Sequence, residues 1–238
     1  MKYWDRKEKL FKYINGVRQF FPLANEQLEI IARLIDKFNP NINSFLDLGC
    51  GDGFLGHFIH KLYPASQGVF VDISEEMIKK AQIKDMGHNS EYIVQDFGKH
   101  EWFKSISKLK KFDLIISGYS IHHIENNEKQ RLYKDIFELL NPNGLFLNLE
   151  HVSSPTRILE ETFNELFLDN MYDYQKYIGE EKTKEEIKEI YHDPKHKALN
   201  KLELVEEQCK WLKKIGFSNV DCYMKIFELA LFGGTKTR

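Results

Sequence analysis

The 238-residue sequence contains only three cysteines and no long apolar run, and each absence excludes classes of protein. Cys50, Cys209 and Cys222 are odd in number and far apart, so they predict neither a disulfide framework nor a zinc site. The apolar runs are much shorter than the roughly 20 residues of a membrane-spanning helix, and the first residues lack a signal-peptide pattern. We therefore expect a cytoplasmic protein in a reducing compartment, with no membrane partner.

An excess of positive charge is also absent. Lysine and arginine total 34 against 36 aspartate and glutamate, which gives a formal net charge of −2. Because nucleic-acid binders usually present a basic face, a nucleic-acid partner is not expected. The 42% share of apolar residues is that of an ordinary globular protein, so the chain can bury a substantial core.

Short apolar runs alternate with helical patterns through the middle of the chain. Runs that are apolar on both faces are typical of parallel strands covered by helices on both sides. The expected strands are residues 44–48, 67–71, 91–95, 112–117 and 144–149. The expected helices between them are residues 54–62, 75–84, 100–108 and 127–140.

Helical segments flank this core, and we expect one domain over residues 1–238. Residues 1–40 form a helical amino-terminal segment with helices over 5–20 and 26–38, residues 41–150 form the core, and residues 151–200, which have no strand pattern, form a helical lid. Residues 201–238 contain a helix over 201–215 and two successive β runs, 217–226 and 228–234, which predict an antiparallel hairpin. The expected fold is α/β and Rossmann-like, with a seven-stranded, mostly parallel sheet.

A loop rich in glycine and acids follows the first expected strand. It reads Asp47-Leu-Gly-Cys-Gly-Asp-Gly53, and its glycines let the backbone turn tightly and approach a ligand. Residues 51–56 also fit the dinucleotide pattern G-x-G-x-x-G, and Asp72 lies at a fitting distance for its ribose-binding acid. Charge favours another ligand, because Asp47 and Asp52 would repel a pyrophosphate. S-adenosylmethionine has a sulfonium, an ammonium and no phosphate, and it suits an acidic loop.

Two further acids end the next strands. Asp72 ends the second strand and can accept both hydroxyls of a ribose, while Ser74 is the better candidate for the helix cap. Asp96 ends the third strand and can accept from an adenine amino group, with Phe97 beside the ring. Taken alone, an aspartate at such a position is as often a turn residue.

The ordered series of motifs resembles the class I S-adenosylmethionine-dependent methyltransferases over roughly residues 40–235. It comprises the glycine loop, Val71-Asp72, Gln95-Asp96, residues 112–116, residues 140–144, Gly216-Phe217 and the closing hairpin. The resemblance implies that S-adenosylmethionine lies at the strand ends, with its methionine part at Gly49 and Gly51. It also implies ribose at Asp72 and adenine at Asp96, where Met77 often packs. The cofactor-binding residues expected on this basis are Asp47, Gly49, Gly51, Asp72, Ile73, Met77, Asp96, Phe97 and Ser117.

The motifs leave four functions open. Methyl transfer to a small-molecule acceptor comes first, in a monomer or homodimer. Residues 232–234 resemble a subgroup that includes carboxy-S-adenosylmethionine synthase of tRNA wobble modification, but that subgroup tends to lose one glycine of the loop, whereas Gly49, Gly51 and Gly53 are all present. A catalytically silent S-adenosylmethionine-binding subunit is the third reading, and a nicotinamide oxidoreductase ranks below it.

The end of the fourth strand, Ser117-Gly-Tyr-Ser-Ile-His-His123, is expected beside the sulfonium. His122 is the candidate general base, because the ordinary pKa of histidine lies near operating pH. Both histidines could equally cap a helix or pack under the lid. Candidate acceptor-binding residues are Tyr13, Arg18, His123, Glu150 and Tyr172, although aromatic residues of a lid more often form its own core. Residues 191–197 contain two histidines and an aspartate, but Pro194 favours a loop, and no metal site is expected.

Overall fold

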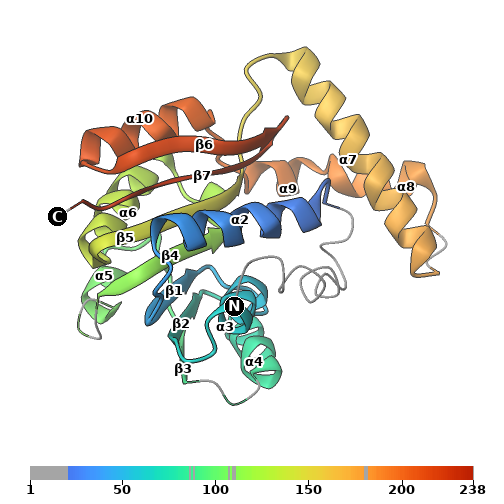
Figure 1. Cartoon of the computed structure of the whole chain (residues 1–238). Helices are drawn as coiled ribbons and strands as arrows, with labels where there is room; N and C mark the ends of the chain where they lie inside the picture. Colours follow the sequence, from blue (N-terminus) through green and yellow to red (C-terminus); the bar gives the residue numbers. More distant parts are fainter. Residues whose placement is uncertain are drawn as a thin grey trace.

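Seven strands form one sheet in the computed structural model, which describes residues 21–85, 87, 89–106, 108, 111–179 and 182–237. The strands are β1 (Ser44–Leu48), β2 (Gln67–Asp72), β3 (Ser90–Val94), β4 (Phe112–Gly118), β5 (Leu140–His151), β6 (Ser218–Ile226) and β7 (Leu229–Thr235). Their spatial order is β3-β2-β1-β4-β5-β7-β6 (Figure 1). The first five pair in parallel, and β7 runs antiparallel to both β5 and β6. The predicted mostly parallel sheet with a carboxy-terminal antiparallel hairpin is confirmed.

Helices cover both faces of this sheet. One layer contains α2 (Ala24–Phe38), α3 (Phe54–Leu62) and α4 (Glu75–Lys84); the other contains α5 (Glu101–Ile106), α6 (Asn126–Leu139) and α10 (Val205–Ile215). Successive residues of a strand face opposite layers, so Phe45 packs against α2 and α3 while Leu46 packs toward α6. This burial on two faces explains why the central strands β1, β2 and β4 are mainly apolar rather than alternating.

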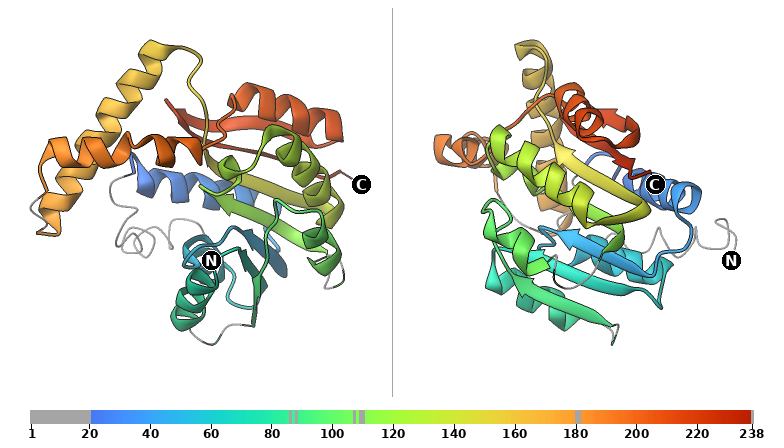
Figure 2. Two further views of the ribbon diagram at one scale, coloured as in Figure 1. Left: turned by 180° about the vertical axis from the view of Figure 1, so that it is seen from behind. Right: turned by 90° about the vertical axis from the view of Figure 1, so that its left-hand side faces the viewer.

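The lid lies beyond the end of β5. It consists of α7 (Arg157–Tyr177), α8 (Lys184–Tyr191) and α9 (Pro194–Ala198). Figures 1 and 2 show these helices past the edge at which β5 ends, on the side away from the carboxyl terminus of the chain. A capping box starts α8, in which Thr183 and Glu186 bond each other's backbone N–H groups. Within the described residues, no helix has the combined length and apolarity that crossing a membrane requires.

Most predicted elements agree with the structure within a few residues, and two differ for identifiable reasons. The fifth strand begins at Leu140 rather than Gly144, because Leu140 pairs with Phe112 before the register shifts. The final helix begins at Val205 rather than residue 201. The preceding residues are instead bonded across the fold, with Lys201 N–H donating to the carbonyl of His122 and Ser153 N–H to the carbonyl of Glu203. The helix predicted over residues 5–20 lies outside the described residues.

Candidate functional site

The glycine loop after β1 packs against two other strand ends. Gly49 has φ +68°, and a Cβ there would lie 1.8 Å from Oγ of Ser120 and 3.3 Å from the Phe97 ring. Ser120 follows β4 and Phe97 follows β3, so only a residue without a side chain lets these three segments meet. Gly51 also has a positive φ, +54°, but a Cβ there would meet nothing within 4 Å. The loop is therefore closed on the Gly49 side and open at Gly51, where a ligand can approach the backbone.

The acids of this loop have different surroundings. Asp47 is buried, and its Oδ2 accepts the N–H of Gly56 in α3 at 2.8 Å, so it supports the loop from beneath. Its predicted contact with a cofactor stays a prediction. Asp52 lies at the surface and forms an ion pair with Lys84. The loop is still negative around Cys50, where Asp47 and Asp72 lie close to the thiol. Burial first, and then these two carboxylates, raise the pKa of the Cys50 thiol. Cys50 is therefore a neutral thiol rather than a nucleophile.

Asp72 joins the glycine loop to the second strand end. Its Oδ2 accepts the N–H of Gly51 at 2.8 Å, and its Oδ1 accepts the N–H of Ser74 at 2.8 Å. The half-buried carboxylate keeps lone pairs for further donors, as the predicted ribose contact requires. Ser74 is the helix cap, as expected, since its Oγ accepts the N–H of Met77 at 3.3 Å. Ile73 and Met77 are exposed beside this carboxylate and are available to an apolar ring.

Asp96 and Phe97 occupy the third strand end. Asp96 Oδ1 accepts the N–H of Gly98 at 2.9 Å, which fixes the turn, and Oδ2 lies 3.7 Å from the Lys99 ammonium. Arg131 of α6 donates to the carbonyls of Phe97 and Gly98 at 3.1 and 2.7 Å. Sequence reasoning did not identify Arg131, which holds the segment that carries the two expected adenine contacts.

The chain turns sharply at the end of β4. Ser117 is fully buried, and its Oγ donates to the carbonyl of Leu48 at 2.7 Å, so its side chain ties β4 to β1 and leaves only its backbone for the predicted contact. Tyr119 has φ +52° and donates its N–H to the carbonyl of Leu149. A single 3-10 turn, η2 (Ile121–His123), follows and carries both candidate histidines.

His122 is held by Glu150 at the end of β5. His122 Nδ1 lies 2.6 Å from Glu150 Oε1, and the backbone N–H of His122 donates to Oε2 at 3.0 Å. Burial by itself would raise the pKa of the Glu150 carboxyl, but the charge and hydrogen bond of His122 and the N–H of His151 lower it below its ordinary value. Glu150 is therefore an acceptor-only carboxylate, so the Nδ1 of His122 that faces it carries a proton.

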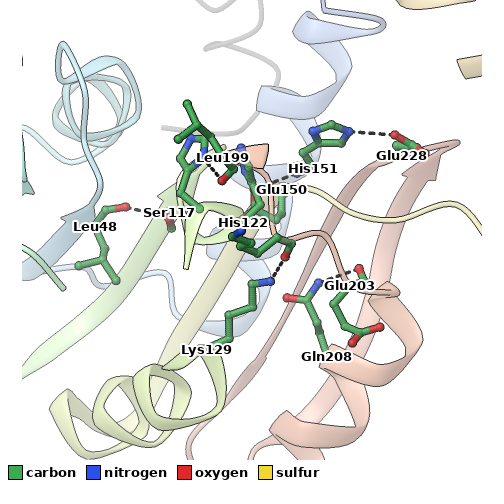
Figure 3. A network of polar contacts seen from close by, with 12 residues as sticks. Leu48, Ser117, His122, Lys129, Glu150, His151, Leu199, Glu203, Gln208 and Glu228 are labelled. Atoms are coloured by element: carbon green, nitrogen blue, oxygen red, sulfur yellow. Dashed lines mark hydrogen bonds and ion pairs between the residues drawn. The ribbon is translucent and has the colours of Figure 1, made fainter. Parts of the chain in front are cut away.

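A buried lysine supports this turn from α6 (Figure 3). Lys129 Nζ donates to Asn126 Oδ1 at 2.9 Å and to the carbonyl of Lys201, whose own N–H donates to the carbonyl of His122 at 2.7 Å. Burial lowers the pKa of Lys129, while Glu150, Glu203 and Glu125 act in the opposite direction. Lys129 thus clamps the segment after the lid onto the histidine turn and supplies a cation near the buried Glu150.

A second histidine–glutamate pair lies next to the first. His151 Nε2 is 2.9 Å from Oε2 of Glu228, which precedes β7, and the His151 ring contacts that of His122 edge-on at 5.5 Å. His123 lies on the other side of His122, with ring centroids 4.0 Å apart, and its Nδ1 is 3.2 Å from the carbonyl of Leu199. Burial, and then His122, lower the pKa of His123.

A cavity of about 340 Å³ opens between this second pair and the lid. Its lining comprises His151 and Glu228 from the sheet edge, Glu160, Asn164 and Met171 from α7, Ile190 and Tyr191 from α8, and Lys197, Asn200 and Leu202 from the segment that returns to the core. Such a volume suits a small metabolite. A larger opening between α7 and α8 is lined by charged residues of the lid and lies away from the strand ends.

Aromatic rings connect the cavity with the end of β4. The ring centroid of Phe163 lies 5.8 Å from that of His151 and 5.4 Å from that of Phe167. Phe167 in turn contacts Phe21, whose ring stacks on Tyr119 with centroids 4.5 Å apart. These lid aromatics therefore form part of a core above the strand ends, the alternative that the sequence also allowed.

The structure brings together the predicted residues of five strand ends, namely Gly49, Gly51, Asp72, Asp96, Phe97, His122 and Glu150. Tyr172 is half-buried on α7 with Lys176 over its ring, and the lining of the cavity includes its neighbour Met171 instead. Tyr13 and Arg18 lie outside the described residues. Sequence reasoning missed Lys129, Tyr191 and Glu228. No group of three or more histidine, cysteine, aspartate or glutamate side chains could hold a metal ion in the part of the chain that the structure describes.

Comparison with known proteins gives a consistent relationship. Residues 42–214 match the family described as methyltransferase domain. The chain is 30% identical to malonyl-[acyl-carrier protein] O-methyltransferase 2 of Ilyobacter polytropus, over 79% of this chain and 70% of that protein. It is 25% identical to carboxy-S-adenosyl-L-methionine synthase of Nautilia profundicola, over 94% of both chains. Among solved structures, the PH0226 protein from Pyrococcus horikoshii has the same fold, with a TM-score of 0.59, 20% identity and coverage of 97% of this chain and 99% of that chain.

Proposed function

Because this chain belongs to the S-adenosylmethionine-dependent methyltransferase family, we propose that it transfers a methyl group from S-adenosylmethionine to a small molecule and releases S-adenosylhomocysteine. The reaction is a nucleophilic displacement at an activated carbon. The protein has to align the two reactants, exclude water and, for some acceptors, take up a proton. The strand ends and the cavity under the lid supply groups for each of these tasks.

The cofactor has a site of fitting chemistry. The backbone at Gly51 is open, Asp72 offers carboxylate lone pairs beside it, and the surroundings of Cys50 are negative. A cationic ligand without phosphate suits such a loop, whereas a pyrophosphate would meet repulsion. In this proposal the glycine loop holds the methionine part, Asp72 the ribose, and Asp96 with Phe97 the adenine. Ile73 and Met77 cover the ring, and Asp47 and Ser117 hold the loop and β4 in place.

The observation that carries the small-molecule proposal is the cavity beside His151. The cavity, of about 340 Å³, is bounded by the lid and by the edge at which β5 ends. The ring of His122 lies against that of His151, and the turn that carries His122 follows Ser120, which packs on Gly49 of the glycine loop. The ring of His151 would separate a small acceptor in this cavity from the turn that carries His122. His122 and His151, each fixed by a glutamate, are the two candidates for its proton acceptor.

Carboxy-S-adenosylmethionine synthesis is the second candidate, favoured by relatives of that name that cover up to 94% of this chain. It requires a carboxylic second substrate and an arginine that reaches the new carboxylate of the cofactor. Three arginines fall within the described residues, and each has another partner. Arg33 bonds Glu29, Arg131 bonds the carbonyls of Phe97 and Gly98, and Arg157 bonds Glu161. The intact glycine loop, with Gly49, Gly51 and Gly53 all present, favours methyl transfer.

Mass spectrometry distinguishes these functions. One portion of the purified protein would be denatured to release co-purified ligands, and a second, native portion would be incubated with S-adenosylmethionine and pools of small metabolites. We expect bound S-adenosylmethionine or S-adenosylhomocysteine, and acceptor-dependent formation of S-adenosylhomocysteine. Release of carboxy-S-adenosylmethionine would favour the synthase instead. Cofactor binding without turnover of any pool would favour a silent binding subunit, and binding of NAD alone would refute the proposal.

A further inference from the structure

We propose that the cavity beside His151 binds a neutral, hydroxyl-bearing acceptor and that His151, oriented by Glu228, takes up the hydroxyl proton. This inference rests on the proposed function and adds to it the acceptor class and the identity of the base. It assigns the proton to the histidine that lines the cavity rather than to His122.

A molecule in the cavity has direct access to His151. His151 lines the cavity together with Glu228 and Tyr191, whereas His122 is absent from its lining. His122 is also immobilised on several sides, since its ring and its N–H both bond Glu150 and its carbonyl accepts from Lys201. The His151 side chain is 18% exposed, against 9% for His122. A molecule in the cavity therefore meets His151 first.

Glu228 fixes the tautomer of neutral His151. Glu228 is buried, and its backbone carbonyl accepts the N–H of Val152 at 2.8 Å, which fixes it against the end of β5. Its Oε2 lies 2.9 Å from His151 Nε2, and a carboxylate only accepts. The ring proton of neutral His151 is therefore on Nε2, so Nδ1 has the lone pair that a base requires.

The lining of the cavity contains groups of both charges. Two carboxylates, Glu160 and Glu228, and one ammonium, Lys197, belong to its lining. Burial, and then the carboxylates of Glu228 and Glu160, raise the pKa of Tyr191, which remains a neutral phenol. The charged and titratable groups that act on His151 or share its cavity are Glu150, His122, His123, Glu160, Tyr191, Lys197 and Glu228.

These surroundings select the acceptor class. A carboxylate acceptor would be repelled by two of the three formal charges in the lining, and it needs no base because it is already ionised. A neutral hydroxyl avoids that repulsion and has to lose a proton, which the lone pair of His151 can accept. Asn164, Asn200 and Tyr191 offer hydrogen bonds to its other polar groups, and Met171, Ile190 and Leu202 cover apolar parts.

The proposed step transfers a methyl group to the acceptor and a proton to His151. The hydroxyl oxygen of the acceptor forms a bond to the methyl carbon while its proton passes to Nδ1 of His151. The electron pair of the broken carbon–sulfur bond stays on sulfur, which becomes a neutral thioether. His151, then an imidazolium paired with Glu228, releases its proton to water after the product leaves.

Binding and tautomer can be tested before a natural acceptor is known. Calorimetry on protein saturated with S-adenosylhomocysteine would compare phenol and benzoate, which share one ring and differ in charge. We expect phenol to bind at least tenfold more tightly than benzoate. His151→Gln should weaken phenol binding severalfold with unchanged affinity for S-adenosylhomocysteine, while His100→Gln, an exposed control on another side of the core, should leave both unchanged. Benzoate binding as tightly as phenol, or no phenol binding, would overturn the acceptor class.

Nitrogen NMR of labelled histidine would report the tautomer directly. We expect the proton of neutral His151 on Nε2 in the parent protein and a mixture of tautomers in Glu228→Gln. A proton on Nδ1 of His151 in the parent protein would overturn the assignment of the base. With a hydroxyl acceptor from the metabolite pools, His151→Gln should reduce kcat by about 100-fold or more, the usual scale of general-base catalysis. Failure to bind S-adenosylhomocysteine would instead contradict the proposed function, so the two failures are distinguishable.

Discussion

Glu150 Oε1 lies 2.6 Å from Nδ1 of His122, and the same oxygen accepts the backbone N–H of His151 at 2.8 Å. One buried carboxylate thus orients the ring of one histidine and the backbone of the next. Glu150 lies on the face of β5 that is covered by α6, where the ammonium of Lys129 is buried as well. The two histidines therefore respond together to any change at Glu150.

Glu150→Gln should destabilise the protein in a pH-dependent manner. The folded-state pKa of Glu150 is below its ordinary value of 4.5, so its carboxylate stabilises the fold above that value, and the contribution is lost as pH falls through the folded pKa. We expect a loss of about 3 kcal/mol at pH 7, because Lys129 remains buried without that counter-charge. Urea unfolding at pH 7 and below pH 4 should show the difference shrinking in acid, whereas Glu91→Gln, on an exposed strand residue, should change little at either pH. A difference independent of pH would argue against an ionised Glu150.

His122→Gln should reduce turnover while leaving the affinity for the cofactor unchanged. His122 contacts the ring of His151 and shares Glu150 with it, so its loss disturbs the orientation of the cavity-facing histidine. We expect a fall in kcat of about 10-fold, smaller than that of His151→Gln, measured by release of S-adenosylhomocysteine. A larger fall for His122→Gln than for His151→Gln would return the role of base to His122.

Asp72→Ala should weaken the binding of S-adenosylmethionine by about 1–3 kcal/mol through the loss of charge-assisted hydrogen bonds. The same change removes the acceptor of the Gly51 N–H, so the loop also loses order. Isothermal titration calorimetry provides the measurement. Asp52→Ala is the matched control, because Asp52 belongs to the same loop but pairs with Lys84 at the surface. Equal affinities of the two variants would remove Asp72 from the ribose site.

Gly49→Ala should disrupt the site more than a glycine replacement at another position of positive φ. At Gly49 the added methyl group would collide with Ser120, whereas at Gly87, with φ +84°, it would meet nothing within 4 Å. Both variants pay for the strained backbone conformation, by about 1 kcal/mol, and only Gly49→Ala adds the collision. Thermal unfolding and cofactor titration should show a clear loss for Gly49→Ala and a small one for Gly87→Ala. Equal behaviour would show that the loop has room to move away from Ser120.

The sequence predicts the sheet well because its strands are buried on both faces and are separated by helices with clear ends. The predicted limits of α3 and α4 agree with the structure, and the glycine loop, Asp72 and Asp96 could be placed at the strand ends because parallel strands end at one edge. The predicted strand at 144–149 was too short, since the pairing of Leu140 with Phe112 depends on a distant strand.

Residues whose role depends on tertiary placement could not be predicted. Lys129 has the sequence context of a surface lysine on an amphipathic helix, and its burial follows from the segment that folds over it after the lid. Glu228 begins the second predicted β run, and that pattern gives no sign of its pairing with His151 at the end of β5. The cavity requires the lid to be placed against the sheet edge, and helical periodicity gives no information about that placement.

The antiparallel direction of β7 has a practical consequence for handling the protein. Glu228 precedes β7 at the edge where β5 ends, while Thr235 pairs with Leu145 near the opposite edge. Seven residues of extended chain separate the two, which is roughly 20 Å along the strand. A fluorophore attached close to Thr235 would therefore lie on the side away from the lid and should leave ligand entry unobstructed.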